Sequence, residues 1–237
     1  MCIRDSPVIG LNSGIILTSG RALNADETND SDGISYPAGQ SGDIDLTALV
    51  APEVTNDAAV LEFDFVSDGG DLYFNYVFAS DEYNEFVYQY NDVFGFFVDG
   101  ENIALVPNST DYVSIDKVNG GNPYGTNPSN PDYYINNDLD DGGAEPFEYD
   151  GFTTVLTAVI TGLSAGTHHI KLVVADTGDS ALDSAVFIEA GSFTNHNPVW
   201  DIQNYSDTLF SGSFSGKLLD LRITEAVSYT HLTLPTN

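Results

Sequence analysis

Residues 61–78 read LEFDFVSDGGDLYFNYVF, and this stretch decides the fold. On both sides of a turn at Ser67–Asp71, apolar side chains alternate with polar ones. This two-residue period is typical of a β-strand that buries one of its faces. Leu61–Phe65 and Leu72–Phe78 are therefore predicted to be two strands that form a hairpin-like pair.

Strand patterns continue along the chain. Val93–Val98 is an almost continuous apolar run, which predicts a strand buried on both faces. Phe152–Ile160 and His169–Ala175 are predicted strands on either side of a short loop, and Ala185–Phe193 closes the series. No segment has a sustained helical period. The sequence therefore predicts an all-β fold, a two-sheet antiparallel β-sandwich that is jelly-roll-like.

The domain boundaries follow from where this pattern stops. Residues 119–149 are rich in Asn, Asp, Gly, Pro and Tyr and are predicted to form a long loop, a kind of segment that is usually functional. Beyond Thr194 the strand pattern is lost. We therefore assign residues 7–194 to one β-sandwich domain and residues 195–226 to a linker or the start of a following module.

Both ends of the chain look foreign to the domain. One short DNA element, read in opposite orientations, encodes both Met1–Ser6 and Val227–His231, and Leu232–Asn237 looks like translated sequencing adapter. We interpret residues 1–6 and 227–237 as adapter-like scars and exclude them from fold reasoning. The single Met and the single Cys both lie in the first scar, so the native part offers no disulfide.

The composition excludes several classes of function. The chain has 36 acidic and 6 basic residues and a net charge of −30, which repels a phosphate backbone and therefore excludes nucleic-acid binding. No apolar run approaches the ~20 residues that a membrane-spanning helix needs. With 42% hydrophobic residues, the chain has enough apolar material for the core of one domain.

Acidic residues cluster where the predicted strands begin and end. Calcium prefers six to eight hard oxygen ligands, and loops that carry closely spaced Asp and Gly supply them. The alternative is that each Asp caps a turn through its own backbone, which requires no metal. Because so few basic residues are present to neutralise the clusters, we favour calcium as the cofactor. The candidate ligands are Asp81, Glu82, Asp92, Asp150, Asp176, Asp179 and Asp183.

Two patterns resemble catalytic motifs. Gly162–Gly166 matches the G-x-S-x-G pattern of hydrolases, but strands predicted on both sides make it a hairpin loop, whereas a nucleophile elbow requires a helix after the serine. His168 and His169 are adjacent on a strand, so they are expected to point to opposite faces. Glu82 and Glu85 could form the carboxylate pair of a glycosidase, but pairs arise by chance in so acidic a chain. We therefore predict that the protein is not an enzyme.

Aromatic residues in the long loop suggest a second kind of site. The side chains of Tyr124, Tyr133 and Tyr134 could stack on sugar rings. The alternative is that they are ordinary amphipathic surface residues. Carbohydrate binding is therefore the alternative function.

The order of the motifs resembles the choice-of-anchor L domain family. The resemblance covers about residues 10–193 and rests on several motifs in the family's order. These are Leu61–Phe65, Tyr76–Tyr83 (YVFASDEY), Asn91–Phe97 (NDVFGFF), Tyr149–Thr153 (YDGFT) and Ala175–Ile188 (ADTGDS to DSAVFI), after an opening strand at Gly14–Gly20. Asp81 departs from the Glu that is common in the family, but a carboxylate remains.

The resemblance implies location rather than catalysis. Such domains occur in exported bacterial proteins whose C-terminal anchoring signals vary. We therefore expect a secreted or cell-surface module, calcium-stabilised and non-catalytic, with a role in adhesion or surface structure. Its expected partners are a surface glycan or protein ligand and other domains of the same polypeptide.

Overall fold

The computed structural model describes residues 2–6, 8–26 and 28–194 of the chain. All strand pairs in this part of the chain are antiparallel. The elements in chain order are β1 (Cys2–Ser6), β2 (Leu11–Thr18), η1 (Asn24–Asp26), α1 (Ile44–Val50), β3 (Thr55–Ser80), β4 (Val93–Val98), β5 (Glu101–Asn102), β6 (Val113–Ser114), η2 (Pro131–Tyr133), β7 (Tyr134–Asn136), β8 (Gly151–Thr153), β9 (Leu156–Thr177) and β10 (Ser184–Glu189).

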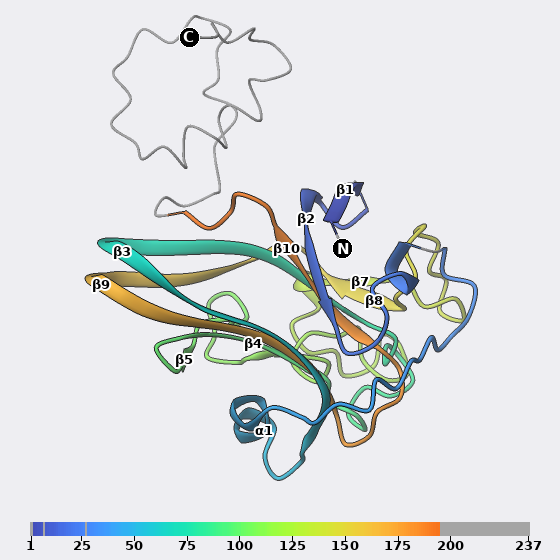
Figure 1. Cartoon of the computed structure of the whole chain (residues 1–237). Helices are drawn as coiled ribbons and strands as arrows, with labels where there is room; N and C mark the ends of the chain where they lie inside the picture. Colours follow the sequence, from blue (N-terminus) through green and yellow to red (C-terminus); the bar gives the residue numbers. More distant parts are fainter. Residues whose placement is uncertain (1, 7, 27, 195–237) are drawn as a thin grey trace, which may run out of the picture.

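The two longest strands, β3 and β9, pair with each other along nearly their whole length. In the first half of β3, Leu61 pairs with Leu172, and in the second half Phe74 pairs with Ala158. Turn-forming residues of the two strands lie opposite each other between these halves, at Ser67–Asp71 and Gly162–Gly166. The β3–β9 ribbon reaches the left edge of Figure 1 and doubles back there.

This ribbon corrects two predictions from the sequence. Leu61–Phe65 and Leu72–Phe78 do not form a hairpin-like pair, because each takes its partner from β9 in the described register. The short loop predicted before His169 is also wrong, since β9 is continuous from Leu156 to Thr177. The turn-rich segment of β3 (Ser67–Asp71) lies beside the turn-rich segment of β9 (Gly162–Gly166), so the two strands remain paired through the bend. Each segment by itself has the composition of a turn, and for this reason the sequence predicted a loop at each place.

The bend divides the sheet into two layers. One layer contains the second half of β3, with β10, β2 and β1 on one side and the first half of β9 on the other. The other layer contains the first half of β3, the second half of β9, and β4 with β5. The predicted all-β antiparallel sandwich is confirmed. It is jelly-roll-like in that one two-stranded ribbon passes from layer to layer.

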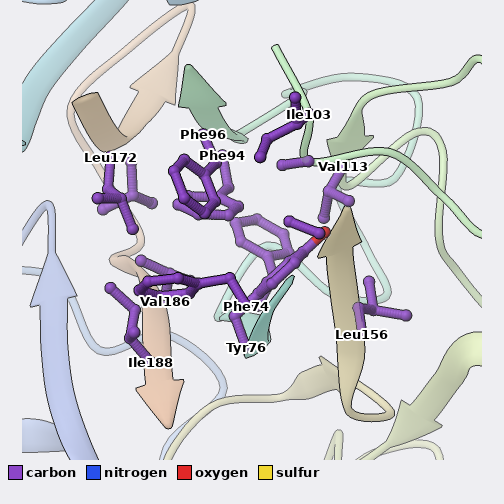
Figure 2. Close-up of a cluster of buried hydrophobic side chains, with 14 of the residues drawn as sticks. Phe74, Tyr76, Phe94, Phe96, Ile103, Val113, Leu156, Leu172, Val186 and Ile188 are labelled. Atoms are coloured by element: carbon purple, nitrogen blue, oxygen red, sulfur yellow. The ribbon is translucent and has the colours of Figure 1, made fainter. Parts of the chain in front are cut away.

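The main core fills the space between the layers. The Phe74 ring lies 4.9 Å from that of Phe96, and the Tyr76 ring lies 5.0 Å from that of Phe94. Figure 2 shows these rings converging with aliphatic side chains of β9 and β10. Because Phe74 and Tyr76 belong to one layer and Phe94 and Phe96 to the other, these contacts hold the two layers together.

Strand β4 is buried on both faces, as its apolar run predicts. Its outer face packs under α1, where Leu46 and Val50 contact Val93 and Phe97. The sequence pattern did not reveal α1, because seven residues with only two buried positions give no sustained period. Its local signal was Asp43, whose side chain caps the helix by accepting from the backbone N–H groups of its first turn.

The long loop at residues 119–149 contains more structure than predicted, since η2 and β7 lie within it. Buried amide side chains hold the rest. Asn137 Nδ2 donates to the carbonyls of Phe147 (2.6 Å) and Tyr149 (3.0 Å), and its Oδ1 accepts from Glu145 N–H. The loop therefore obtains from side chains the hydrogen bonds that strands obtain from each other.

The ends of the chain are described only in part. Cys2–Ser6, within the first adapter-like segment, pairs with β2 as strand β1. The predicted linker at 195–226 and the second adapter-like segment at 227–237 lie outside the described residues. Among the residues that are described, no helix has the length and apolar character needed to cross a membrane.

Candidate cation-binding end of the sandwich

One end of the sandwich collects the strand ends that carry acidic residues. β3 ends at Ser80 beside the start of β10, and β9 ends at Thr177 beside the start of β4. The two layers touch at this end, where the Ser184 hydroxyl donates to Asp92 Oδ2 at 2.7 Å. Because the candidate ligands flank these strand ends, the fold brings all of them to this end, which we call the carboxylate end. They are Asp81, Glu82, Asp92, Asp150, Asp176, Asp179 and Asp183.

Six of these seven residues are buried, with at most 2% of their surface exposed. Asp179 is the half-buried one. Carboxylates are almost never fully buried unless a cation or several hydrogen bonds compensate for their lost hydration. For each buried carboxylate, the cation or the hydrogen bonds that replace its lost hydration therefore have to be identified.

Basic side chains do not neutralise these carboxylates. Lys171 pairs with Asp43 and Asp45, and Lys117 pairs with Asp111. The two ion-paired histidines contact other carboxylates, those of Asp99, Glu62 and Asp64. Within residues 2–6, 8–26 and 28–194, no ion pair involves any of the seven candidate ligands. Their negative charge has no protein counter-charge in contact with it.

Three candidates form what we call the Asp81 group: Asp81, Asp150 and Asp183. Burial, followed by the charges of Asp150, Glu148 and Asp183, raises the pKa of Asp81 well above its ordinary value. Burial raises the pKa of Asp150 to about 8, against the effect of a hydrogen bond from Asn29. In both carboxyl groups the raised pKa favours the protonated form when no cation is bound.

Asp183 is the best satisfied member of the Asp81 group. Burial raises its pKa, while the backbone N–H groups of Tyr36 (2.7 Å) and Arg21 (3.4 Å) lower it. A Cβ atom at Gly20 would lie 1.7 Å from Asp183 Oδ2. Glycine at position 20 therefore lets the N-terminal segment close over this carboxylate.

The other four candidates form the Glu82 group: Glu82, Asp92, Asp176 and Asp179. Burial, and then the charges of Asp179 and Asp176, raise the pKa of Glu82 to about 9. Burial and the charge of Asp92 raise the pKa of Asp176 to about 9. Burial also raises the pKa of Asp92, although Ser184 Oγ–H and Thr177 N–H donate to its two oxygens.

Several buried oxygen atoms at the carboxylate end have no hydrogen-bond partner. They include both carboxylate oxygens of Asp81, Oδ2 of Asp150 and the amide oxygen of Asn29. In the Glu82 group they are Glu82 Oε2, Asp176 Oδ1 and the Thr177 hydroxyl. Buried polar atoms are nearly always paired, so each of these needs an explanation. All of them are hard oxygen donors, the type that calcium prefers.

The side chains are not already arranged around an ion. Among the described residues, no group of three or more His, Cys, Asp or Glu side chains is disposed to hold a metal. Calcium also takes amide, hydroxyl, backbone carbonyl and water oxygens, so its coordination does not depend on three carboxylates alone. The calcium assignment stays a prediction, and the unpaired buried oxygens are the observation that supports it.

Some details of the site were not visible in the sequence. Asp179 fits the turn-capping alternative, since its Oδ1 accepts from the backbone N–H of Ala181 at 3.0 Å. Asn29 and Thr177 were not among the candidates, although they contribute unpaired oxygens. Thr177 directly follows Asp176 and could have been found from that position. Asn29 lies about 120 residues from Asp150, and only the fold brings them together.

The three tyrosines do not form one exposed platform. Tyr124 is 45% exposed. Tyr133 packs against the main core, and Tyr134 donates its hydroxyl hydrogen bond to Asn84 Oδ1 at 2.6 Å. The ring of Tyr134 also lies 4.8 Å from that of Tyr83. Only Tyr124 is therefore presented to solvent as a sugar-stacking ring requires.

The opposite end of the sandwich contains the G-x-S-x-G segment. Its residues lie within β9 and pair with β3, so the predicted hairpin loop is wrong, but no helix follows the serine either. His168 contacts Asp99 Oδ2 (2.6 Å) and the backbone carbonyl of Ser164 (2.9 Å), not its hydroxyl. His169 contacts Glu62 and Asp64 on the other face, as the alternation predicted. The serine is not arranged as a nucleophile.

Together, the fold and the site define an acidic two-layer β-sandwich with a cluster of buried carboxylates at one end. The sequence model of the choice-of-anchor L domain family matches residues 4–194, and the chain belongs to that family. This is a family of non-enzymatic, surface-associated bacterial modules. No curated protein and no solved structure matches the chain.

Proposed function

We propose that this domain is a non-catalytic extracellular module of a bacterial surface or secreted protein, that calcium stabilises it, and that it serves in adhesion or surface structure. The observation that carries the calcium proposal is the set of buried acidic oxygens at the carboxylate end that have no protein partner. A divalent cation would neutralise the repulsion between these carboxylates. Membership of a surface-associated family supports the location.

The expected effect is moderate. Extracellular calcium modules have dissociation constants of roughly 10⁻⁴ to 10⁻³ M, so millimolar calcium adds about 1 kcal/mol per site. For a domain of this size, that corresponds to a rise in Tm of about 2–4 °C per site. Thermal unfolding of the full chain in EDTA, followed by a calcium titration, measures it. Magnesium at equal concentration controls for charge screening.

A double variant, Asp81→Asn with Glu82→Gln, tests where calcium acts. It replaces two ionisable carboxyl groups with neutral amides of the same shape, so we expect a higher Tm in EDTA and little further rise with calcium. The matched control is Asp132→Asn with Glu145→Gln, at two exposed positions. A wild-type Tm that responds equally to calcium and magnesium, or to neither, would overturn the calcium proposal.

Carbohydrate binding is the second candidate, favoured by the exposed ring of Tyr124 on the long loop. An exposed aromatic face can stack on a sugar ring. Glycan-array screening of the wild-type chain and of Tyr124→Ala tests this function. A signal that survives loss of the ring would place sugar binding elsewhere, and no signal would count against it.

A further inference from the structure

The first half of β3 has one edge that pairs with β9 and a second edge that is largely open. On the open edge, the segment before α1 reaches only the start of the strand, where the Ser41 carbonyl accepts from Ala58 N–H at 3.2 Å. Beyond the bend, Thr194 and then β10 pair with the second half of β3 on this edge. Among the described residues, no strand or bridge joins residues 59–66 on this side, which we call the free edge.

The hydrogen bonds of β9 show which backbone groups point out of the free edge. His169 N–H donates to Asp99 Oδ1 (2.9 Å), and the His169 carbonyl accepts from Asp99 N–H (2.9 Å), so the His169 backbone faces the end of β4. Asp64 pairs with His169. Because the direction of these groups alternates along an antiparallel ladder, Asp64 directs its N–H and C=O away from β9, out of the free edge. Every second residue does the same, namely Val60, Glu62 and Val66.

The side chains along the free edge combine apolar surface with negative charge. Val60 and Val66 are 45% and 78% exposed. Between them on the same face lie Glu62 and Asp64, which both contact His169. A protonated His169 balances only one of these two charges. Residues 59–66 contain no Pro or Lys, the residues with which proteins commonly protect an edge from pairing.

A second copy of the chain fits the free edge poorly. Antiparallel pairing of two free edges about Phe63 would place Glu62 of one copy opposite Asp64 of the other, and like charges across a strand pair are destabilising. The net charge of −30 on each copy adds to this repulsion. A strand with Lys or Arg opposite Glu62 and Asp64 would gain the attraction that a second copy lacks.

We propose that the free edge of β3 docks an extended segment of another polypeptide, which adds to the sheet as a strand. The segment carries apolar residues beside Val60 and Val66 and basic residues beside Glu62 and Asp64. Hydrogen bonds to the outward backbone groups hold it, and the alternating side chains select it. The free edge includes none of the carboxylates proposed to bind calcium, so this docking is independent of calcium.

A blocked peptide of sequence VTKVKTV is the probe, because its outer-face pattern of Val, Lys, Lys and Val matches the free edge in either strand direction. Amide NMR spectra of the full chain during a titration, together with amide hydrogen exchange, measure its binding. We expect the peptide to shift and protect the N–H groups of Glu62 and Asp64. The N–H groups of Leu61 and Phe63 point toward β9 and should stay protected with or without the peptide.

Two control peptides separate strand pairing from charge attraction. VTKPKTV has the same charge, but its proline lacks a backbone N–H and interrupts an added strand. VTEVETV keeps the strand propensity and reverses the charge. Neither should protect Glu62 and Asp64. Equal binding of VTKPKTV and VTKVKTV would overturn the proposal.

Substitutions in the chain test the same edge. Val60→Pro removes one outward N–H without changing the charge, so we expect about tenfold weaker binding. Val60→Thr keeps that N–H and is the matched control. Glu62→Gln with Asp64→Asn should also weaken binding, by a factor that shrinks as salt is added. The exposed pair Asp132→Asn with Glu145→Gln should bind as the wild type does. Circular dichroism checks the fold of each variant, and the Glu62, Asp64 variant carries the test if Val60→Pro does not fold.

Three results would overturn the docking proposal without touching the calcium proposal. One is the absence of any shift with VTKVKTV at millimolar concentration. Another is unchanged binding in both folded edge variants. The third is protection of the Glu62 and Asp64 N–H groups before any peptide is added. Sedimentation equilibrium would then assign the edge either to a second copy, if the chain dimerises, or to another part of the same chain, if it is monomeric.

Discussion

At the scale of single residues, the carboxylate end shows how burial changes the chemistry of ordinary side chains. Asp81 is fully buried, with both carboxylate oxygens unpaired, yet its neighbours in space are other acids. Such a group exists either protonated or with a cation beside it, because an isolated charge in this position is too costly. If calcium binds here as proposed, protons and calcium would compete for the same oxygens.

This competition predicts a specific pH dependence in EDTA. The pKa values of Asp150 (about 8), Glu82 and Asp176 (about 9 each) lie above those of the unfolded chain, so the folded state binds these protons more tightly. Their stabilising contribution is complete below about pH 4 and is lost as the pH rises toward 9. We expect the free energy of unfolding to fall between pH 5 and pH 9 by about 1.4 kcal/mol per pH unit for each proton retained, and Tm to fall with it.

Thermal unfolding at several pH values, with and without calcium, checks this prediction. Calcium should raise Tm more at pH 8 than at pH 5, since at pH 5 it has to displace the protons. The Asp81→Asn, Glu82→Gln double variant should show a flatter pH profile in EDTA. Stability that rises between pH 5 and pH 9 in the wild type would contradict the assignment.

At the scale of elements, helix α1 depends on a single capping residue. Asp43 Oδ1 accepts from Asp45 N–H (3.0 Å) and Leu46 N–H (3.1 Å), and Asp43 also pairs with Lys171. Asp43→Ala removes both functions and is expected to lower the free energy of unfolding by about 1–2 kcal/mol. Asp43→Asn preserves the cap and should recover most of that loss, because Asp45 still pairs with Lys171.

Urea unfolding of the two variants measures the difference. If Asn and Ala cost the same, the ion pair with Lys171 rather than the cap would be what stabilises α1. Lys171→Met then removes the ion pairs together with the ammonium group, which lies 5.8 Å from the centroid of the Phe97 ring, while a side chain of similar length remains.

The elements also show what the sequence could and could not predict. Val93–Val98 was identified correctly because burial on both faces leaves a continuous apolar run. The pairing of β3 with β9 was not identified, since it joins segments about 100 residues apart and no local pattern encodes a partner. The seven acidic candidates were located from strand-end positions, but their division into two groups depends on which strand ends meet in space.

At the scale of the whole molecule, the net charge of −30 acts on the entire fold. Self-repulsion destabilises the compact state, and salt screens it. The Debye length falls from about 10 Å at 0.1 M to about 3 Å at 1 M salt. We therefore expect Tm in EDTA to rise as sodium chloride increases over this range, and to rise less when calcium is saturating.

Differential scanning calorimetry across a salt series measures this response. Choline chloride at matched ionic strength should give the same rise, because screening does not depend on the identity of the cation. A larger response to sodium than to choline would indicate site binding of the monovalent ion, and a Tm that does not change would contradict the role of self-repulsion.

The neighbouring strands β2 and β10 have a mechanical consequence for a protein displayed on a cell. They are antiparallel, with Gly14 opposite Glu189 and Thr18 opposite Ala185, so the chain enters β2 and leaves β10 at the same end of the sheet. A tensile load between these two points peels the strands apart one hydrogen-bonded pair at a time. Strand separation proceeds toward Ser184 and reaches the carboxylate end last. Cations bound there would resist the final step of the separation.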